Sequence, residues 1–401
     1  MLQVMTLDQA NRLLQKTFEN CFSGAETVPL SAAAGRVLAA DVCAAEYVPD
    51  FDRSQVDGYA LRASDTFGCS ESIPALLEKV GEVLMGEAPQ VRLRAGECAY
   101  VPTGGALPEG ADAMVMIEHT EVFPDGTIAV LSPTAPGRSV IFRGDDVKPG
   151  DAVLPAGRRL SPSDVGALAA MGVSAVSVCR KLRVGVLSTG DELVECFEKP
   201  AMGEIRDVNR PMLLAMMTAL GAESVDLGIC RDDYDTLRGR VAAAARECDM
   251  LLLSGGTSVG TKDASALVVA ELGELLVHGL ALKPGKPTLA GSIGGKPVFG
   301  LPGHPVAAYF VTKLCVEPLL RSMTGEMGAL RTVRCRLSRT VPSNNGREEI
   351  VAVHLTGNGE AEPVAAKSGL ITTLSGAEGF IRIPRDREGF AAGAEVEVHL
   401  F

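Results

Sequence analysis

The 401-residue sequence lacks closely spaced metal or redox ligands and long apolar runs. Its ten cysteines are scattered, and the nearest two are Cys179 and Cys196. Without a CxxC or HxxxH pair, neither a zinc site nor a redox dithiol is encoded locally. No apolar run approaches the roughly 20 residues that a membrane span needs. The N-terminus predicts a capped helix and not a signal peptide. Together with the scattered thiols, this leads us to expect that the protein resides in the reducing cytoplasm.

The sequence also lacks an excess of positive charge. Lys and Arg number 38 against 50 Asp and Glu, a formal net charge of −12. This balance argues against nucleic-acid binding, which normally needs a basic face. A phosphate can still bind locally, through backbone N–H groups at a helix N-terminus and one or two lysines. The excess of carboxylates also suits Mg²⁺.

A chain of this length exceeds what one hydrophobic core usually serves, so we expect a multidomain protein. The first residues, MTLDQANRLLQKTF, predict an amphipathic helix with a capping box from Thr6 to Gln9. Residues 1–50 and 139–180, with a short helix from Pro162, predict a linking domain. Residues 51–138 predict a β-rich second domain, because short apolar stretches alternate with Gly and Pro. Residues 326–401 alternate with period two and predict a small C-terminal β-barrel or sandwich.

Residues 181–325 carry the clearest fold signal. Alternating apolar strands and helices with short connections predict a mostly parallel, three-layer α/β domain with helices on both faces of its sheet. The predicted strands span residues 181–187, 223–229, 249–256 and 275–282, followed by a hairpin from residue 291. The predicted helices span residues 208–221, 234–247, 264–273 and 306–323.

The segment SGGTSVGTKD, residues 254–263, follows the third predicted strand. Open α/β sheets bind ligands at this edge, where glycines let backbone N–H groups approach a phosphate. The segment lacks both the Walker A lysine-serine pair and the GxGxxG spacing, which disfavours an ATPase or a Rossmann dinucleotide site. A tight turn without a ligand remains the alternative. Asp263 is either a metal ligand or the cap of the next helix.

Two further loops are expected at the same edge. LALKPGKPT places Lys283 and Lys286 on either side of a Pro-Gly turn, and STGDEL offers Asp191 and Glu192 after the first strand. GLPGHPVAA opens a helix whose N-terminus would point at the same pocket. Together these loops predict a phosphate or oxyanion site, although each alone is compatible with a solvated turn.

The N-terminal half carries candidate residues in turn-rich segments. Asp57 lies before Gly58 in VPDFDRSQVDGYAL, and RGDDVKPGD contains Asp145 and Asp146. On local grounds a β-turn explains Asp57, and solvated side chains explain the two later aspartates.

Seven of these segments, in order, resemble molybdopterin molybdenumtransferases, the family that includes the C-terminal domain of gephyrin. They are FDRSQVDGYA, PTGGALPEGAD, FRGDDVKPGD, STGDEL, SGGTSVGTKD, LKPGKP and GLPGHPV. The resemblance implies four domains and an elongated homodimer, with each site between the α/β domain of one subunit and parts of the other. It implies a reaction in which adenylylated molybdopterin and molybdate, with Mg²⁺, give molybdenum cofactor and AMP.

The resemblance also implies roles for particular residues. The catalytic candidates are Asp57, Thr103, Asp146, Glu192, Asp232 and Asp263, with Asp263 and Glu192 as Mg²⁺ ligands. The pterin, phosphate and oxyanion candidates are Ser254, Gly255, Gly256, Ser258, Gly260, Lys283, Lys286, Pro302, Pro305, Arg347 and Ser368. The upstream adenylyltransferase and downstream molybdoenzymes are candidate partners, and neither nucleic acid nor a membrane is expected.

The chain departs from the usual family pattern at a few positions: Arg53, Val56, Gly279, His304, Ala307 and Lys367. None of these changes removes a carboxylate, so the reaction is kept, but a tungstate-preferring paralogue would look similar. Two other functions remain open. A nucleotide pyrophosphatase on the same α/β domain would turn over simple dinucleotides without molybdate, and a non-catalytic pterin-binding scaffold could dispense with the acidic residues.

Overall fold

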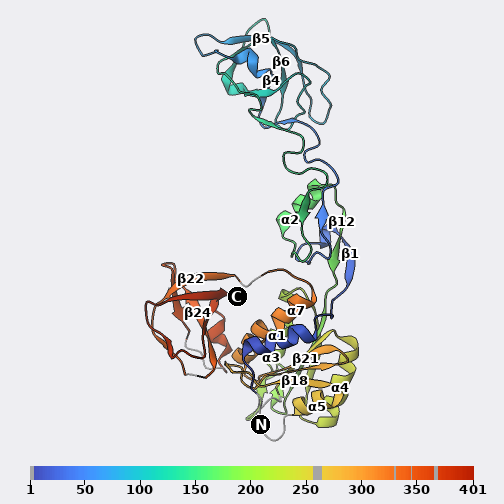
Figure 1. Cartoon of the computed structure of the whole chain (residues 1–401), viewed down its shortest axis with the longest axis vertical. Helices are drawn as coiled ribbons and strands as arrows, with labels where there is room; N and C mark the ends of the chain where they lie inside the picture. The colour runs from blue at the N-terminus through green and yellow to red at the C-terminus, as the bar shows by residue number, and fades with distance from the viewer. Residues whose placement is uncertain (1–3, 256–263, 329–330, 345, 365–368) are drawn as a thin grey trace. The chain divides into compact units, whose positions relative to one another are not determined.

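The computed structural model describes residues 4–255, 264–328, 331–344, 346–364 and 369–401 (Figure 1). The chain divides into two compact units. The first contains Met1–Ala40, Ala156–Ser161 and Ala175–Phe401, and the second contains Asp41–Pro155 and Pro162–Ser174. The ranges of the four domains stay a prediction.

A six-stranded sheet forms the centre of the first unit, in the order β16-β13-β17-β21-β20-β18. β13 pairs in parallel with β16 and β17, and β17 with β21, whereas β20 runs antiparallel to both of its neighbours. The bounds are β13 (Arg183–Thr189), β16 (Glu223–Cys230), β17 (Met250–Ser254), β18 (Glu274–His278), β20 (Leu289–Ile293) and β21 (Lys296–Leu301). Every residue of β17 is buried, as expected for a parallel strand with both faces covered.

Alternate residues of these strands pack into two different hydrophobic clusters. Val184 and Leu252 belong to a cluster that contains Leu213 of α3 (Asn209–Ala219). Leu251 and Leu253 pack with α4 (Tyr234–Glu247) and α5 (Ala264–Leu272). The first cluster also receives a helical run made of α6 (Pro305–Val311), a π-helical turn (Thr312–Val316) and α7 (Glu317–Met323). The predicted strand–helix alternation is therefore confirmed along this part of the chain.

Helix α1 (Leu7–Thr17) joins the same cluster as α3. Thr6 caps it as predicted: the Thr6 side chain accepts a hydrogen bond from the Gln9 backbone N–H, and the Gln9 side chain accepts one from the Thr6 N–H. Leu7 and Leu14 lie about two helical turns apart, on the same face of the helix, and both are buried.

The predicted end of the fourth strand, residues 275–282, is wrong. β18 ends at His278. Gly279 has a φ of +105°, a backbone conformation that residues other than glycine rarely adopt. The Gly279 N–H donates to the Thr288 carbonyl, and the Gly279 carbonyl accepts from the Met5 N–H. The chain thus leaves the sheet, and β19 (Leu282–Lys283) pairs instead with β24 of the C-terminal sheet.

The C-terminal strands close into a ring, which confirms a small barrel-like sheet. Its order is β24-β25-β22-β28-β26, with β26 pairing back to β24. The strands are β22 (Thr332–Leu337), β24 (Glu348–Leu355), β25 (Glu360–Pro363), β26 (Gly379–Ile383) and β28 (Glu395–Leu400). Inward side chains such as Val353, Ile381 and Val398 are fully buried. Short pairs elsewhere in the unit are β1 (Ala25–Pro29) with β12 (Ala175–Cys179), β14 (Leu193–Val194) with β15 (Ile205–Arg206), and β23 (Val341–Pro342) with β27 (Gly389–Phe390).

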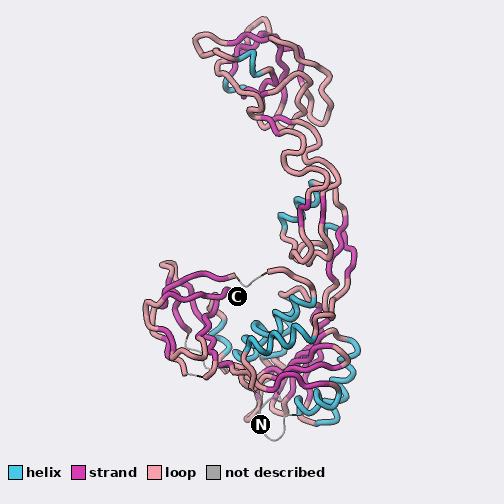
Figure 2. The backbone as a smooth tube through the Cα atoms, in the orientation of Figure 1, coloured by secondary structure: helices cyan, strands magenta, loops and turns pink. Residues whose placement is uncertain are grey.

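Strands and loops predominate in the second unit, as predicted for residues 51–138 (Figure 2). Its main sheet has the order β7-β4-β6-β5-β9-β8. The bounds are β4 (Gly58–Leu61), β5 (Ala75–Glu82), β6 (Glu97–Val101), β7 (Ala113–Met116), β8 (Thr120–Val122) and β9 (Thr127–Val130). The other elements are β2 (Val42–Cys43), β3 (Arg53–Ser54), β10 (Val140–Ile141), β11 (Ala152–Leu154) and α2, which begins at Pro162 as predicted (Pro162–Ala170). Nowhere in the described chain is a helix both long and apolar enough to cross a membrane.

Candidate functional site

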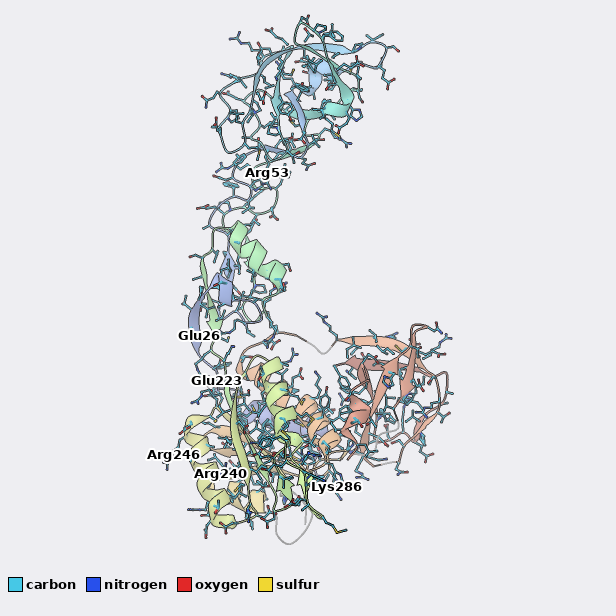
Figure 3. All side chains as sticks on the ribbon, turned by 180° about the vertical axis from the view of Figure 1, so that it is seen from behind. Glu26, Arg53, Glu223, Arg240, Arg246 and Lys286 are labelled. Atoms are coloured by element: carbon cyan, nitrogen blue, oxygen red, sulfur yellow. The ribbon has the colours of Figure 1, made fainter. Side chains whose placement is uncertain are left out.

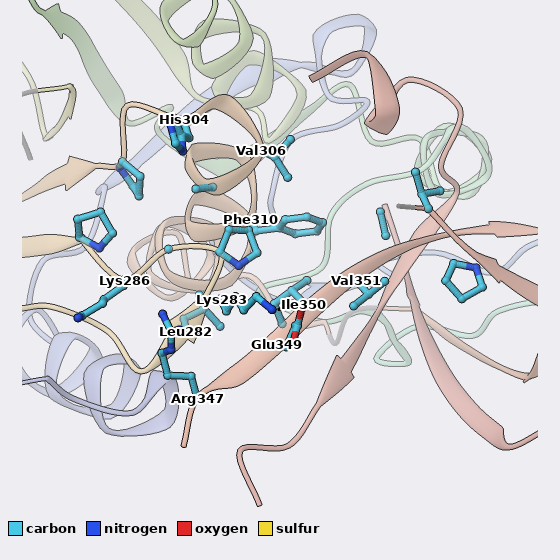
Figure 4. Close-up of a pocket in the computed structure, with 18 of the residues that line it drawn as sticks. Leu282, Lys283, Lys286, His304, Val306, Phe310, Arg347, Glu349, Ile350 and Val351 are labelled. Atoms are coloured by element: carbon cyan, nitrogen blue, oxygen red, sulfur yellow. Dashed lines mark ion pairs between the residues drawn. The ribbon is translucent and has the colours of Figure 1, made fainter. Parts of the chain in front are cut away.

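A pocket of about 920 Å³ lies in the first unit, within the size range of small-molecule sites (Figure 4). It is bounded by the Lys-Pro-Gly-Lys turn after β19, the start of α6, and β24. Four lining side chains are lysine or arginine: Lys283, Lys286, Arg339 and Arg347. Against these stand two lining carboxylates, Glu192 and Glu349, so the lining favours an anion.

Apolar side chains form another part of the lining. Val306 and Phe310 of α6 and Ile350 and Val351 of β24 face the pocket (Figure 4). The Phe310 ring packs edge-on against the Tyr309 and Phe380 rings, which limits its movement. A ligand with charged groups and a flat apolar part therefore matches the two parts of the pocket.

Lys283 is held by an ion pair inside the pocket. Its Nζ lies 2.8 Å from Glu349 Oε1, and the Ser343 hydroxyl donates to Glu349 Oε2 at 2.6 Å. β19 and β24 pair in parallel at these same residues, which brings the two side chains together. Lys286 is exposed on the other side of the turn and forms no ion pair with another described residue (Figure 3).

Gly255 requires its glycine on steric grounds. Its φ is +98°, and an added Cβ would lie 2.1 Å from the Thr189 carbonyl oxygen. The preceding Ser254 is buried and does not line the pocket, whereas Gly255 does. A close approach of two strand ends thus explains Gly255.

The carboxyl ends of β13 and β16 bring three acidic residues together. The Asp232 N–H donates to Asp191 Oδ1 at 3.2 Å, and Glu192 lines the pocket. Burial, followed by repulsion from Asp191 and Glu192, raises the pKa of the Asp232 carboxyl. Within the described ranges, no group of three or more His, Cys, Asp or Glu residues is arranged to hold a metal ion.

Arg210 is a site-supporting residue that the sequence did not predict. It is buried at the start of α3 and forms ion pairs with Glu195, Asp207 and Asp226. Burial opposes its charge, but these three carboxylates together raise the pKa of Arg210. Glu195 lies three residues after Glu192, so Arg210 holds the segment that follows this pocket carboxylate. An arginine in the first turn of an otherwise apolar helix was the signal available.

The N-terminal candidates lie in the second unit. Asp57 Oδ1 accepts a hydrogen bond from the Thr103 N–H at 2.8 Å, so these two residues are neighbours. Asp146 is exposed in a separate loop, where its N–H donates to the Val48 carbonyl. Arg53 lies in β3 (Figure 3), and within the described chain its buried Nε finds no hydrogen-bond partner.

Some of the remaining candidate residues line the pocket, and others do not. Pro302, Arg347 and the departing residue His304 line the pocket, whereas Pro305 is the first residue of α6 and does not. Six predicted or departing positions lie outside the described residues: Gly256, Ser258, Gly260, Asp263, Lys367 and Ser368.

Fold and site together define a multidomain α/β protein whose pocket suits an anionic small molecule. Family models match nearly the whole chain: "MoeA N-terminal region (domain I and II)" at residues 5–172, "Probable molybdopterin binding domain" at 185–322, and "MoeA C-terminal region (domain IV)" at 334–401. The molybdopterin molybdenumtransferase of Haemophilus influenzae is 32% identical, covering 99% of each chain. That of Bacillus subtilis is 32% identical, over 94% of this chain and 89% of its own. The chain therefore belongs to the molybdopterin molybdenumtransferase family, a family of transferases.

Solved structures agree with this membership. A crystal structure of the molybdopterin biosynthesis MoeA protein from Pyrococcus horikoshii OT3 superposes with a TM-score of 0.87 at 33% identity, covering all of both chains. A second MoeA structure from Pyrococcus horikoshii gives 0.82 at 39% identity over 99% of both chains. The predicted resemblance is confirmed, and the family supports a role in molybdenum cofactor biosynthesis.

Proposed function

We propose that this protein inserts molybdenum from molybdate into adenylylated molybdopterin and releases AMP. The observation that carries the proposal is a pocket lined by four lysine and arginine side chains on one part and by Val306, Phe310 and Ile350 on another. Cationic groups offset the phosphates of such a substrate, and apolar walls accept its flat rings. We also propose that the α/β domain has three layers, that the chain has four domains with the bounds predicted from the sequence, and that the protein is a cytoplasmic homodimer.

Charge neutralisation and positioning are what the chain itself contributes to the reaction. An oxygen nucleophile, water or molybdate, that Asp57 positions adds to the pterin-side phosphorus of the pyrophosphate. The bridging P–O bond breaks, AMP leaves with that electron pair, and a proton carried by the nucleophile passes to solvent. Lys283 and Lys286 stabilise the negative charge on the phosphates. Molybdenum then enters by ligand exchange at the dithiolene of the pterin, so the protein mainly holds the two substrates together. No cysteine is among the described pocket lining.

Mg²⁺ fits the acidic end of the pocket only in part. Mg²⁺ usually keeps several waters and binds through one or two carboxylates together with substrate phosphates. Glu192 is one such carboxylate, and Asp263, from the SGGTSVGTKD segment, is proposed as the second. Burial, followed by repulsion from Asp191 and Glu192, raises the pKa of Asp232, and a bound cation would relieve the repulsive part. Bound there, the ion would neutralise phosphate charge during cleavage.

The test is to incubate the purified protein with adenylylated molybdopterin, Mg²⁺ and either molybdate or tungstate. We expect AMP release that depends on the oxyanion, and cofactor that activates an apo-molybdoenzyme. Asp57→Ala and Asp263→Ala should abolish AMP release without unfolding the protein. Wild-type rates in both variants would contradict the site. Preference for tungstate, hydrolysis of simple dinucleotides without oxyanion, or binding without turnover would each establish one of the alternative functions.

A further inference from the structure

Asn209 is a buried polar residue at the first position of α3 that no sequence motif singled out. The residue is 6% exposed, and its side chain lies between the end of β17 and the segment after β21. The Nδ2 atom donates to Ser254 Oγ at 2.8 Å and to the Gly303 carbonyl at 2.9 Å, with the Pro302 carbonyl at 3.4 Å. One side chain thus joins α3 to the last residue of β17 and to the segment that follows β21.

The surroundings determine the orientation of this amide. Carbonyl oxygens only accept hydrogen bonds, so the atom that faces Pro302 and Gly303 must be the nitrogen. One amide hydrogen goes to the Ser254 hydroxyl and the other to the two carbonyls. Ser254 Oγ therefore accepts this hydrogen bond from Asn209.

Both joined segments line the pocket, although Asn209 does not. Gly255 follows Ser254, and Gly255, Pro302 and Gly303 are all lining residues. A Cβ added to Gly303 would lie 4.0 Å from the Gly255 Cα, so the two segments are adjacent. β17 and β21 pair directly as far as Ser254 and Leu301, and the bonds of Asn209 add a side-chain link between these two pocket walls just beyond that pairing.

Some of the buried polar atoms around Asn209 have no hydrogen-bond partner among the described residues. Within the described chain, Asn209 Oδ1, Ser188 Oγ and Thr189 Oγ1 are buried without a hydrogen-bond partner. Buried polar atoms are normally paired, and unpaired ones cost stability. These buried groups lie at the end of β13 and the start of α3, beside the segments that line the pocket.

We propose that Asn209 is a positioning residue that holds the Ser254–Gly255 strand end against the Pro302–Gly303 turn, so that both walls contact the substrate at a fixed separation. The inference rests on the proposed transfer reaction at this pocket. Because a displacement of about 1 Å can cost about 100-fold in rate, loss of this link should lower kcat more than it raises KM.

The main test variant is Asn209→Asp, which keeps the shape of the side chain. When ionised, the new carboxylate has no donor and faces two carbonyl oxygens. We expect kcat for AMP release to fall about 10- to 100-fold, with KM for adenylylated molybdopterin changed about threefold or less. The ratio of variant to wild-type kcat should recover as pH falls, because the protonated carboxyl regains one donor.

Asn11→Asp is the matched control. Asn11 Nδ2 donates to a single carbonyl, that of Leu314, at 2.8 Å, and like that of Asn209 its Oδ1 is buried without a partner in the described chain. It lies on α1 and lines no part of the pocket. This variant should lose stability while keeping wild-type kcat at every pH. Equal kcat profiles for the two variants would overturn the proposal.

Two further measurements keep the proposal testable. Ser254→Ala removes one of the bonds and should lower kcat in the same direction but less, which applies if Asn209→Asp fails to fold. Hydrogen exchange of residues 250–255 and 296–304 should accelerate in the Asn209 variant and not in the Asn11 variant. Exchange needs no turnover, so it tests the link even if wild-type protein releases no AMP, a result that would contradict the proposed function alone. Unchanged exchange in both segments would overturn the link.

Discussion

Lys283, one of the charged residues of the pocket, already has a protein partner, and this determines how its substitution should act. Lys283 is paired with Glu349, whose second oxygen accepts from Ser343. A substrate phosphate would have to share or replace that pairing. If the Lys283 charge contacts a phosphate throughout the reaction, it stabilises the bound substrate and the transition state equally. It then affects the affinity for the substrate and not the rate of the chemical step.

Lys283→Ala should raise the apparent KM for adenylylated molybdopterin about tenfold while saturated turnover changes much less, since uniform binding is lost. Steady-state kinetics of AMP release measures both values. Lys79→Ala is the control, because Lys79 also forms an ion pair, with Glu82 at 3.4 Å, but in the second unit. A large fall in kcat with unchanged KM would instead assign Lys283 to the transition state.

Asp232→Asn should stabilise the protein slightly at pH 7. The folded-state pKa of Asp232 is raised above 3.8, so the unfolded chain releases this proton first, and stability falls as pH rises through the interval between the two values. The amide removes that cost, and we expect Tm to rise by about 2 °C or less. Scanning calorimetry from pH 4 to 8 checks the sign. Added Mg²⁺ should raise the Tm of wild type more than that of the variant, and equal shifts would argue against a cation near Asp232.

At the scale of secondary structure, Asp249 joins the start of β17 to the entry into β13. Its carboxylate accepts from two Arg180 nitrogens at 3.0 and 3.1 Å and from the Arg183 N–H at 2.8 Å. Burial works to raise the pKa of this carboxyl, but Arg180 and the Arg183 N–H outweigh it and lower the pKa below 3.8. The folded state therefore releases this proton more readily than the unfolded chain.

Asp249→Asn should destabilise the first unit by about 1 to 3 kcal/mol at pH 7, because charged hydrogen bonds are lost. The contribution of the carboxylate is present above the unfolded pKa and is lost as pH falls, so the difference from wild type should shrink below about pH 4. Urea denaturation at pH 7 and pH 3 measures it. Glu223→Gln removes the exposed pair with Arg183 and should cost about 1 kcal/mol or less. A deficit for Asp249→Asn that is independent of pH would contradict the charge argument.

At the scale of the whole molecule, the candidate residues are divided between the two units. Asp57 and Thr103 belong to the second unit, whereas the pocket belongs to the first. The proposed homodimer combines the α/β domain of one subunit with parts of the other. A complete site would then need Lys283 from one chain and Asp57 from its partner.

Mixed dimers of Asp57→Ala and Lys283→Ala chains test this arrangement. If sites are shared, each mixed dimer has one intact site and one doubly substituted site, and it should show about half the wild-type activity at a substrate concentration near KM. If each site lies within one chain, both sites carry a substitution and activity stays at the level of the parents. Differently tagged chains, co-expressed and purified through both tags, supply the mixed dimer.

The sequence by itself determined the elements and the family. Helix α4 spans residues 234–247 as predicted, and the Thr6 capping box forms, because helical periodicity and caps depend on residues a few positions apart. Only the tertiary structure decided that β18 ends at His278, that Lys283 pairs with Glu349, and that Asn209 joins Ser254 to Gly303. These contacts bridge tens of residues, up to 94 from Asn209 to Gly303, so no local pattern encodes them. They exist because folding brings strand ends and helix starts together, and burial then makes each polar group find a partner.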